Sequence, residues 1–128
     1  MPHGSRILVA EDNEMLQRVV KRAFEREGYI VVQAFSSAEL SREIEIAAPD
    51  LIVLDVGLPD ADGRDILANL KKDPKTTGIP VVVWSGRDAP SDRRIALSLG
   101  AEDYVEKGPP SRLVGKVERL LLRLRLQA

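Results

Sequence analysis

Short continuous apolar segments alternate along the chain with longer segments in which apolar residues recur every three or four positions. Continuous aliphatic runs bounded by turn residues predict strands that are buried on both faces of a parallel sheet. The longer segments have the spacing of amphipathic helices, each with one apolar face. The predicted strands are residues 7–10, 29–34, 51–54, 81–84 and 101–106.

Local signals predict where the helices begin and end. Ser36 and Glu39 have the spacing of a capping box before the second helix. Ser111 is expected to cap the last helix, which then runs to the end of the chain. The other expected boundaries are glycine stops at Gly28 and Gly100, a start near Gly63 and a stop before Asp73-Pro74.

Strands that alternate with helices predict parallel pairing with right-handed crossovers. We therefore expect an α/β fold: a single doubly wound (βα)5 flavodoxin-like domain with a parallel five-stranded sheet in the order 2-1-3-4-5. Such folds place their chemistry in the crevice at the carboxyl ends of the strands, here between the first and third strands. The domain is expected to span residues 1–128, with its core at about 6–124 and residues 1–5 disordered.

The composition excludes several classes of function. Hydrophobic residues make up 44% of the chain and charged residues 30%, and the net charge of −1 gives no overall attraction to nucleic acid or membranes. There is no cysteine, and the single histidine is His3, so Ser/His/Asp catalysis, zinc sites and a phosphohistidine role are excluded. No stretch is long and apolar enough to span a membrane and no signal peptide is present, so a cytoplasmic location is expected.

Polar residues follow four of the predicted strands. Glu11 and Asp12 follow the first strand, and Asp55 follows the third. Ser85 follows the fourth strand, and Lys107 the fifth. Because the carboxyl ends of parallel strands meet at one edge of the sheet, these side chains are expected to converge. Three neighbouring carboxylates repel one another unless a cation neutralises them, and oxygen ligands without histidine or cysteine suit Mg²⁺ or Mn²⁺.

A site of this kind suits phosphoryl transfer, which depends mostly on positioning and charge neutralisation. Asp55 would be the nucleophile that forms an acyl phosphate, while Lys107 and the Ser85 hydroxyl would hold the phosphoryl oxygens. Each residue alone also has a structural explanation: Glu11 and Asp12 can stabilise the start of a helix, and the others can belong to ordinary loops. Their joint placement at the ends of different strands favours the functional interpretation.

Four segments of the chain resemble response-regulator receiver domains, the CheY-like family of two-component signalling. They are 7–13 with the acid pair, 55–63 with the phosphoacceptor loop, 81–86 with the hydroxyl, and 100–107 with the switch aromatic and the lysine. The likeness runs from about Arg6 to Leu124, and the four motifs together, in this order and spacing, are highly specific.

The resemblance implies a role for each site residue. Asp12 and Asp55 would bind Mg²⁺ directly, with Glu11 reaching the ion through water and the Gly57 carbonyl supplying another ligand. The catalytic residues would be Asp55, Ser85 and Lys107. The acid pair is Glu-Asp rather than the commoner Asp-Asp, a change that should still permit metal binding.

The resemblance also implies a conformational switch. Ser85 would bond the phosphoryl group on activation, and Tyr104 would then swing inward and change the face made by the fourth helix, fifth strand and fifth helix. The structural alternative for Tyr104 is a half-buried strand residue with its hydroxyl in water. Gly108 stands where the family usually has proline, so any cis bond would move to Gly108-Pro109 or Pro109-Pro110. Arg87, two residues past Ser85, would either cover the site or pair with the phosphoryl group.

The expected function is a phosphorylatable signalling switch. A sensor histidine kinase or a histidine phosphotransfer protein would supply the phosphoryl group, and a downstream protein or a second copy of the chain would respond. The domain would catalyse its own phosphotransfer and slow autodephosphorylation, and it would have no external substrate. It is expected to bind neither nucleic acid nor membranes. One alternative is a phosphorylation-independent interaction module. Another is a dehalogenase-like phosphatase, which would need a second acid where Gly57 stands.

Two further expectations concern apolar side chains. Leu122 and Leu126 are predicted to be exposed on the last helix, among arginines, and to suit a self-complementary two-fold contact. Trp84, the only tryptophan, is predicted to point away from the site because neighbouring strand residues alternate faces, so coupling would pass through the backbone. The residues expected to dock the last helix on the sheet are Leu113, Val117, Leu120, Leu121 and Leu124.

Overall fold

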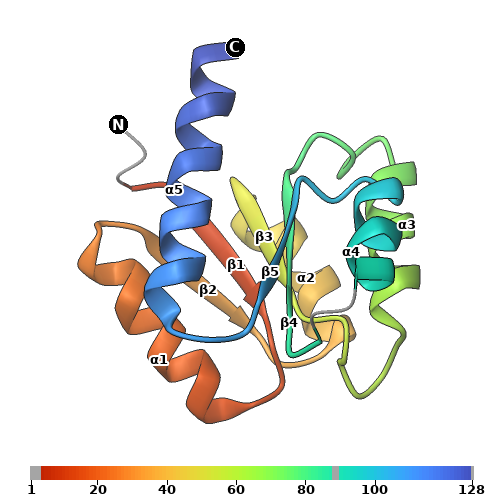
Figure 1. The fold of residues 1–128 in the computed structure, drawn as a ribbon, viewed down its shortest axis with the longest axis horizontal. Helices are drawn as coiled ribbons and strands as arrows, with labels where there is room; N and C mark the ends of the chain where they lie inside the picture. The colour runs from red at the N-terminus through yellow and green to blue at the C-terminus, as the bar shows by residue number, and fades with distance from the viewer. Residues whose placement is uncertain (1–3, 88–89, 128) are drawn as a thin grey trace.

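A parallel sheet lies between two layers of helices (Figure 1). The computed structural model describes residues 4–87 and 90–127. The strands are β1 (Arg6–Ala10), β2 (Ile30–Ala34), β3 (Leu51–Leu54), β4 (Val81–Ser85) and β5 (Asp103–Glu106). The helices are α1 (Glu14–Arg26), α2 (Ser37–Ala47), α3 (Gly63–Lys72), α4 (Pro90–Ser98) and α5 (Pro110–Gln127).

The sheet has the predicted order, β2-β1-β3-β4-β5, and every pairing is parallel. Its register aligns the carboxyl ends of the central strands, since Ala10 pairs with Leu54 and Leu54 pairs with Val83. All four residues of β3 are buried, as expected for a strand covered on both faces. The residues that follow β1, β3 and β4 are therefore brought to one edge of the sheet.

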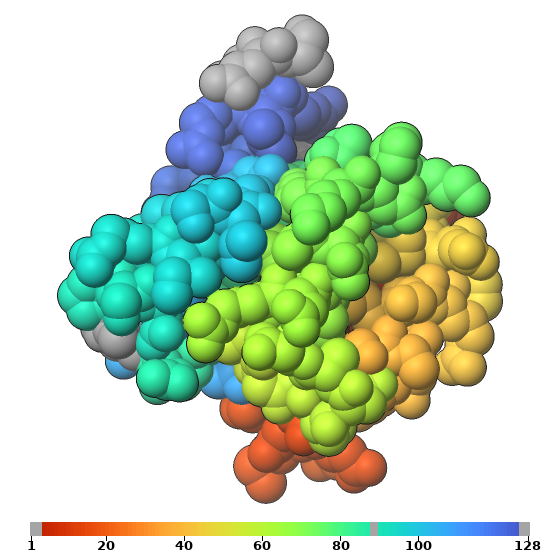
Figure 2. Space-filling view, turned by 90° about the vertical axis from the view of Figure 1, so that its right-hand side faces the viewer, coloured from red at the N-terminus to blue at the C-terminus, as the bar shows by residue number. Residues whose placement is uncertain are grey.

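The two faces of the sheet are covered by different helices. On one face, Ile7 and Val9 of β1 belong to a core that includes residues of α1 and α5. On the other, Leu8 and Ala10 belong to a core with residues of α2, α3 and α4. Figure 2 views this second face, where α4, α3 and α2 lie side by side. The alternation follows from the period of two along a strand.

The helix boundaries largely follow the predicted signals. Ser36 caps α2, its side chain accepting from the Glu39 N–H at 3.2 Å, while the Glu39 carboxylate accepts from the Phe35 N–H at 3.0 Å. Gly28 and Gly100 have positive φ angles of 90° and 109°, which glycine adopts without steric cost.

One predicted boundary is wrong. Helix α5 begins at Pro110, so Ser111 lies in its first turn and is not the residue that precedes it. Proline favours the first helical position because its φ is already helical and its missing N–H would have no intrahelical partner there.

The apolar face of α5 docks as predicted. The residues Leu113, Val117, Leu120 and Leu121 are buried, and Leu124 is partly buried against the same core. Leu122 is 48% exposed, in agreement with the sequence analysis, whereas the Leu126 side chain lies outside the described part of the structure. The C-terminal end of α5 extends beyond the sheet (Figure 1).

The start of the chain is hydrogen bonded from Gly4 onward. The Gly4 N–H donates to the Gly28 carbonyl at 2.8 Å, and the Ser5 carbonyl accepts from Ile30 N–H at 3.0 Å. Of residues 1–5, which were expected to be disordered, residues 1–3 lie outside the described residues. Across the described part of the chain, no helix combines the length and apolarity needed to cross a membrane.

A buried tyrosine gives the fold a predictable pH dependence. The Tyr29 ring packs edge-on against Phe24 with centroids 5.6 Å apart. Burial, with the negative charges of Glu118 and Glu27, raises the pKa of Tyr29 from 10.0 to about 12. Because the folded-state pKa is raised, Tyr29 contributes stability that is complete below pH 10 and is lost as the pH rises toward 12.

Tyr29→Phe should therefore lose less stability than the parent on going from about pH 8 to about pH 11. Urea unfolding of both proteins at the two pH values measures this difference. Equal alkaline losses in the two proteins would contradict the assignment.

Candidate functional site

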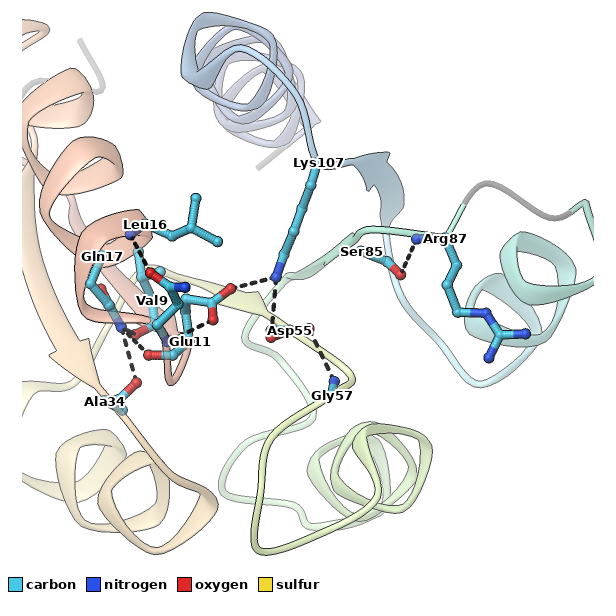
Figure 3. Close-up of polar contacts among 11 residues, drawn as sticks. Val9, Glu11, Leu16, Gln17, Ala34, Asp55, Gly57, Ser85, Arg87 and Lys107 are labelled. Atoms are coloured by element: carbon cyan, nitrogen blue, oxygen red, sulfur yellow. Dashed lines mark hydrogen bonds and ion pairs between the residues drawn. The ribbon is translucent and has the colours of Figure 1, made fainter.

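The predicted acidic residues converge at the carboxyl edge of the sheet, where Figure 3 shows Glu11 and Asp55 beside the Lys107 ammonium. Ligand oxygens of Glu11, Asp12 and Asp55 all lie within 4.8 Å of one another. Glu11 and Asp55 are buried at 1% and 7% exposure, while Asp12 is exposed. The Asp55 N–H donates to the Ala10 carbonyl at 3.0 Å, which ties the ends of β1 and β3 together.

Lys107 reaches across the edge of the sheet into this acidic cluster. Its Nζ lies 2.5 Å from Glu11 Oε1 and 3.2 Å from Asp55 Oδ2 (Figure 3). Its backbone N–H donates to the Ser85 carbonyl at 2.6 Å, which fixes the loop after β5. No cis peptide bond occurs in the described residues, which include Gly108 to Pro110.

Burial and charge act in opposite directions at this ion pair. Burial raises the pKa of the Glu11 carboxyl above 4.5; the Lys107 and Asn13 hydrogen bonds oppose the rise, and the Asp55 charge adds to it. Burial disfavours the Lys107 ammonium, but its hydrogen bond to Glu11 and the charges of Asp55 and Glu11 outweigh this, so the Lys107 pKa is raised above 10.5. Lys107 therefore remains a cation at neutral pH and compensates part of the acidic charge.

The Asp55 carboxylate is open on the side of the following loop. The Gly57 N–H donates to Asp55 Oδ1 at 3.0 Å. A Cβ atom at position 57 would stand 3.6 Å from Oδ1 and 4.0 Å from Oδ2. Glycine at this position therefore leaves room beside both carboxylate oxygens.

The Ser85 hydroxyl lies at the end of β4, bonded to its own loop. Its Oγ accepts from the Arg87 N–H at 3.1 Å. The Arg87 guanidinium is 3.3 Å from Asp92 of α4 and points away from Asp55 (Figure 3). In this structure the Arg87 side chain therefore does not cover Asp55, while its pairing with a phosphoryl group stays a prediction.

Tyr104 differs from its sequence-based description. The side chain is 4% exposed, and its hydroxyl donates to the Arg87 carbonyl at 2.6 Å. The alternative of a half-buried ring with its hydroxyl in water is wrong, and the ring already lies inward in this structure. Tyr104 belongs to the same buried core as Ala96 of α4. The Arg87 N–H also donates to Ser85 Oγ, so the backbone of Arg87 connects the Ser85 hydroxyl to the Tyr104 side chain.

Gln17 contributes to the site although the sequence did not predict it. This buried side chain of α1 donates through Nε2 to the carbonyls of Val9, Glu11 and Ala34, at 2.8, 3.0 and 3.0 Å. It therefore fixes the backbone from which Glu11 projects. The available signal was a polar residue on the otherwise apolar face of the first predicted helix.

The environment of Trp84 was only partly predicted. The ring belongs to the core beneath α1 and α5, as strand alternation requires. However, Lys107 Nζ lies over the indole ring, 5.0 Å from its centroid. Besides the predicted route through the backbone, the structure therefore gives Trp84 a direct contact with a side chain of the site.

Comparison with known proteins assigns the family. Residues 7–118 match the family described as the response regulator receiver domain. This match covers most of the chain, so the chain belongs to the receiver domains of two-component response regulators.

A curated relative shows the same relationship. The alkaline phosphatase synthesis transcriptional regulatory protein PhoP of Bacillus subtilis is 33% identical over 126 residues, covering 98% of this chain and 52% of PhoP. The chain spans about half the length of the curated relatives it matches.

Solved structures agree with the fold and the family. A CheY-like receiver domain protein from Methanospirillum hungatei has a TM-score of 0.88 and 26% identity, covering 98% of this chain and 99% of that one. The phosphorylated cyanobacterial phytochrome response regulator RcpA has a TM-score of 0.77 and 31% identity, covering 91% of both chains.

Proposed function

We propose that this receiver domain is a phosphorylatable switch whose phosphoacceptor is Asp55. The observation that carries the proposal is the convergence of Glu11, Asp12 and Asp55 within 4.8 Å, with Lys107 bonded to two of them. The crystal structure of phosphorylated RcpA, a 31% identical regulator, supports it. The proposed domain is the whole chain with its core at about 6–124, of which residues 7–118 match the family.

The residues at the site fit a hard divalent cation, Mg²⁺ or Mn²⁺. Their donors are oxygens, and the acidic cluster carries more negative charge than Lys107 alone compensates. Asp12 and Asp55 would hold the ion directly, Glu11 through water, and the Gly57 carbonyl would complete the protein ligands. When bound, the cation neutralises charge on the transferred phosphoryl group.

Three side chains carry out the proposed transfer. An oxygen of Asp55 attacks the phosphorus of a phosphohistidine, the P–N bond breaks, and the leaving nitrogen keeps the electron pair and takes up a proton. Lys107, already 3.2 Å from Asp55, pairs with the phosphoryl oxygens. The Ser85 hydroxyl turns from the Arg87 N–H to donate to the same group. Water entering beside Gly57 would later hydrolyse the acyl phosphate. The domain would therefore hydrolyse only its own phosphoryl group and would not act as an enzyme on an external substrate.

The alternatives account for fewer of the observations. A phosphorylation-independent module has no need of an acid cluster, a hydroxyl and a lysine together, and this chain keeps all three kinds of group. A dehalogenase-like phosphatase needs a general acid and base two residues after the nucleophile, where this chain has Gly57.

The proposed partners are a sensor histidine kinase or a histidine phosphotransfer protein on the input side, which implies a cytoplasmic location. On the output side we propose the face made by α4, β5 and α5. Leu97 of α4 and Leu122 of α5 are 40% and 48% exposed. The Arg93–Asp103 ion pair, at 3.4 Å, links α4 to β5.

The test of the proposed function is phosphorylation by a small donor. Incubation with acetyl phosphate and Mg²⁺ is expected to add one phosphate to the chain, detected as an increase in intact mass. Chelation of the divalent cation with EDTA should prevent the increase. A chain that gains no phosphate with the cation present, or gains as much in EDTA, would overturn the proposal.

Removing the Lys107 charge should strengthen metal binding. In this structure the Lys107 ammonium forms ion pairs with the carboxylates of Glu11 and Asp55, so it competes with a divalent cation for them. Lys107→Met is expected to bind Mg²⁺ roughly tenfold more tightly, the equivalent of about 1.4 kcal/mol, in calorimetric titrations. The matched control is Lys71→Met, which removes a lysine paired with Glu102 instead. Unchanged or weaker binding by Lys107→Met would count against the proposed ligand set.

Self-association through the output face is expected to depend on phosphorylation. With beryllofluoride as a phosphoryl mimic, light scattering should show a rise toward the dimer mass. Leu122→Glu should abolish the rise because it places a charge in the apolar contact. Met15→Glu on α1, where the parent residue is 68% exposed, is the control and should leave it intact. A monomer in both states would exclude the self-dimer and leave a different protein as the target.

A further inference from the structure

The indole ring of Trp84 lies beneath the ammonium of Lys107. The distance of 5.0 Å from Nζ to the ring centroid falls within the range of a cation–π interaction. The ring is 2% exposed and the Lys107 side chain is 22% exposed. Because much of the contact is shielded from water, it should be stronger than a cation–π pair on an open surface.

Sheet geometry explains how the two side chains meet. Trp84 pairs with Val105 across β4 and β5, and both side chains enter the core beneath α1 and α5. Lys107 follows Val105 by two residues, which on an extended chain returns its side chain to the same side. The hydrogen bond from Lys107 N–H to the Ser85 carbonyl keeps the chain in register at this point.

The other contacts of Lys107 are with charged groups. Its ammonium is bonded to Glu11 and Asp55, the carboxylates assigned above to the divalent cation. A bound cation would compete for both of them, whereas the indole is neutral and does not bind a hard cation. The ring is therefore a contact that Lys107 can keep when the carboxylates are engaged elsewhere.

We propose that Trp84 is a positioning residue, whose ring holds the Lys107 ammonium beside Asp55 for phosphoryl transfer. This inference rests on the proposed function, because it assigns Lys107 to the phosphoryl group. The structural alternative is that the indole only fills the core. Trp84→Leu would destabilise the domain in either case, so a change that preserves the size of the ring is needed.

The chain offers such a change because Trp84 is its only tryptophan. Protein produced with mono-, di- and trifluorinated tryptophan is altered at residue 84 alone. Each fluorine withdraws electrons from the ring face and so weakens the electrostatic attraction of a cation, with little change in ring size. The matched series in Lys107→Met keeps the ring and removes the cation.

The first measurement is the rate of phosphorylation by acetyl phosphate with saturating Mg²⁺. The rate should fall stepwise with fluorine number, roughly three- to tenfold over the series. The second is the urea midpoint in EDTA, which should fall with fluorine number in the parent but not in Lys107→Met. This second readout depends on neither metal nor phosphate.

The outcomes separate the two proposals. A parent that accepts phosphate while its rate does not change with fluorination would overturn the positioning role and leave the proposed function intact. Equal midpoint shifts in both backgrounds would show that the ring only packs. A parent that accepts no phosphate would overturn the proposed function and with it the role of Trp84 in transfer. The urea midpoints would still show whether the cation–π contact between Lys107 and Trp84 stabilises the fold.

Discussion

Asp55→Asn is expected to take up no phosphate under conditions in which the parent chain gains one. An amide cannot act as the nucleophile, so no acyl phosphate forms at this position. The substitution is nearly isosteric, and the amide oxygen can still accept from the Gly57 N–H that now bonds Oδ1 at 3.0 Å. The fold should therefore persist while labelling falls below detection in the intact mass.

Asp65→Asn is the matched control for this loss. Asp65 is an exposed carboxylate in the first turn of α3, directly after the loop that follows Asp55. Its amide variant should label like the parent. Labelling of Asp55→Asn to the parent's level would remove Asp55 from the role proposed for it.

Gly63→Ala is expected to destabilise the domain strongly. A Cβ atom at this position would stand 2.2 Å from Val56 Cα and 2.6 Å from Val56 Cβ, so the backbone itself must move. The Gly63 N–H also donates to the Val56 carbonyl at 3.2 Å, which holds the two ends of the loop that follows Asp55 together. We expect a loss of about 3 kcal/mol or more in the free energy of unfolding, measured in urea.

Gly78→Ala provides the comparison. A Cβ atom there would have nothing within 4 Å, and its φ does not lie in the left-handed region. Alanine at this position should be neutral or slightly stabilising, because it restricts the unfolded chain. If Gly63→Ala lowers the free energy of unfolding by no more than Gly78→Ala does, the loop after Asp55 is not packed closely against the start of α3.

The order of the sheet could be predicted because its strands carry strong local patterns. Leu51 to Leu54 form a continuous aliphatic run and are all buried in β3. The convergence of Glu11, Asp55 and Lys107 followed from the same pattern, since parallel strands bring their carboxyl ends to one edge.

What could not be predicted depends on side-chain geometry between distant residues. The buried Tyr104 hydroxyl requires the Arg87 carbonyl as an acceptor, and the two residues are 17 positions apart. The contact of Trp84 with Lys107 requires the register of β4 with β5. No local pattern encodes these distances.

The start of α5 was missed for a different reason. Ser111 and Pro110 are both favourable near a helix N-terminus, and the sequence alone does not choose between them. Gln17 was missed for the first reason, because its three backbone acceptors come from the ends of β1 and β2 and are assembled only in the folded sheet.

Locating the phosphate within the chain tests the account most directly. After incubation with acetyl phosphate and Mg²⁺, borohydride reduction converts an aspartyl phosphate to homoserine, which peptide mass spectrometry can place in the sequence. The account predicts homoserine at position 55 and an unmodified Asp12. Homoserine at any other aspartate, or none in a chain that has gained the mass of a phosphate, would contradict it.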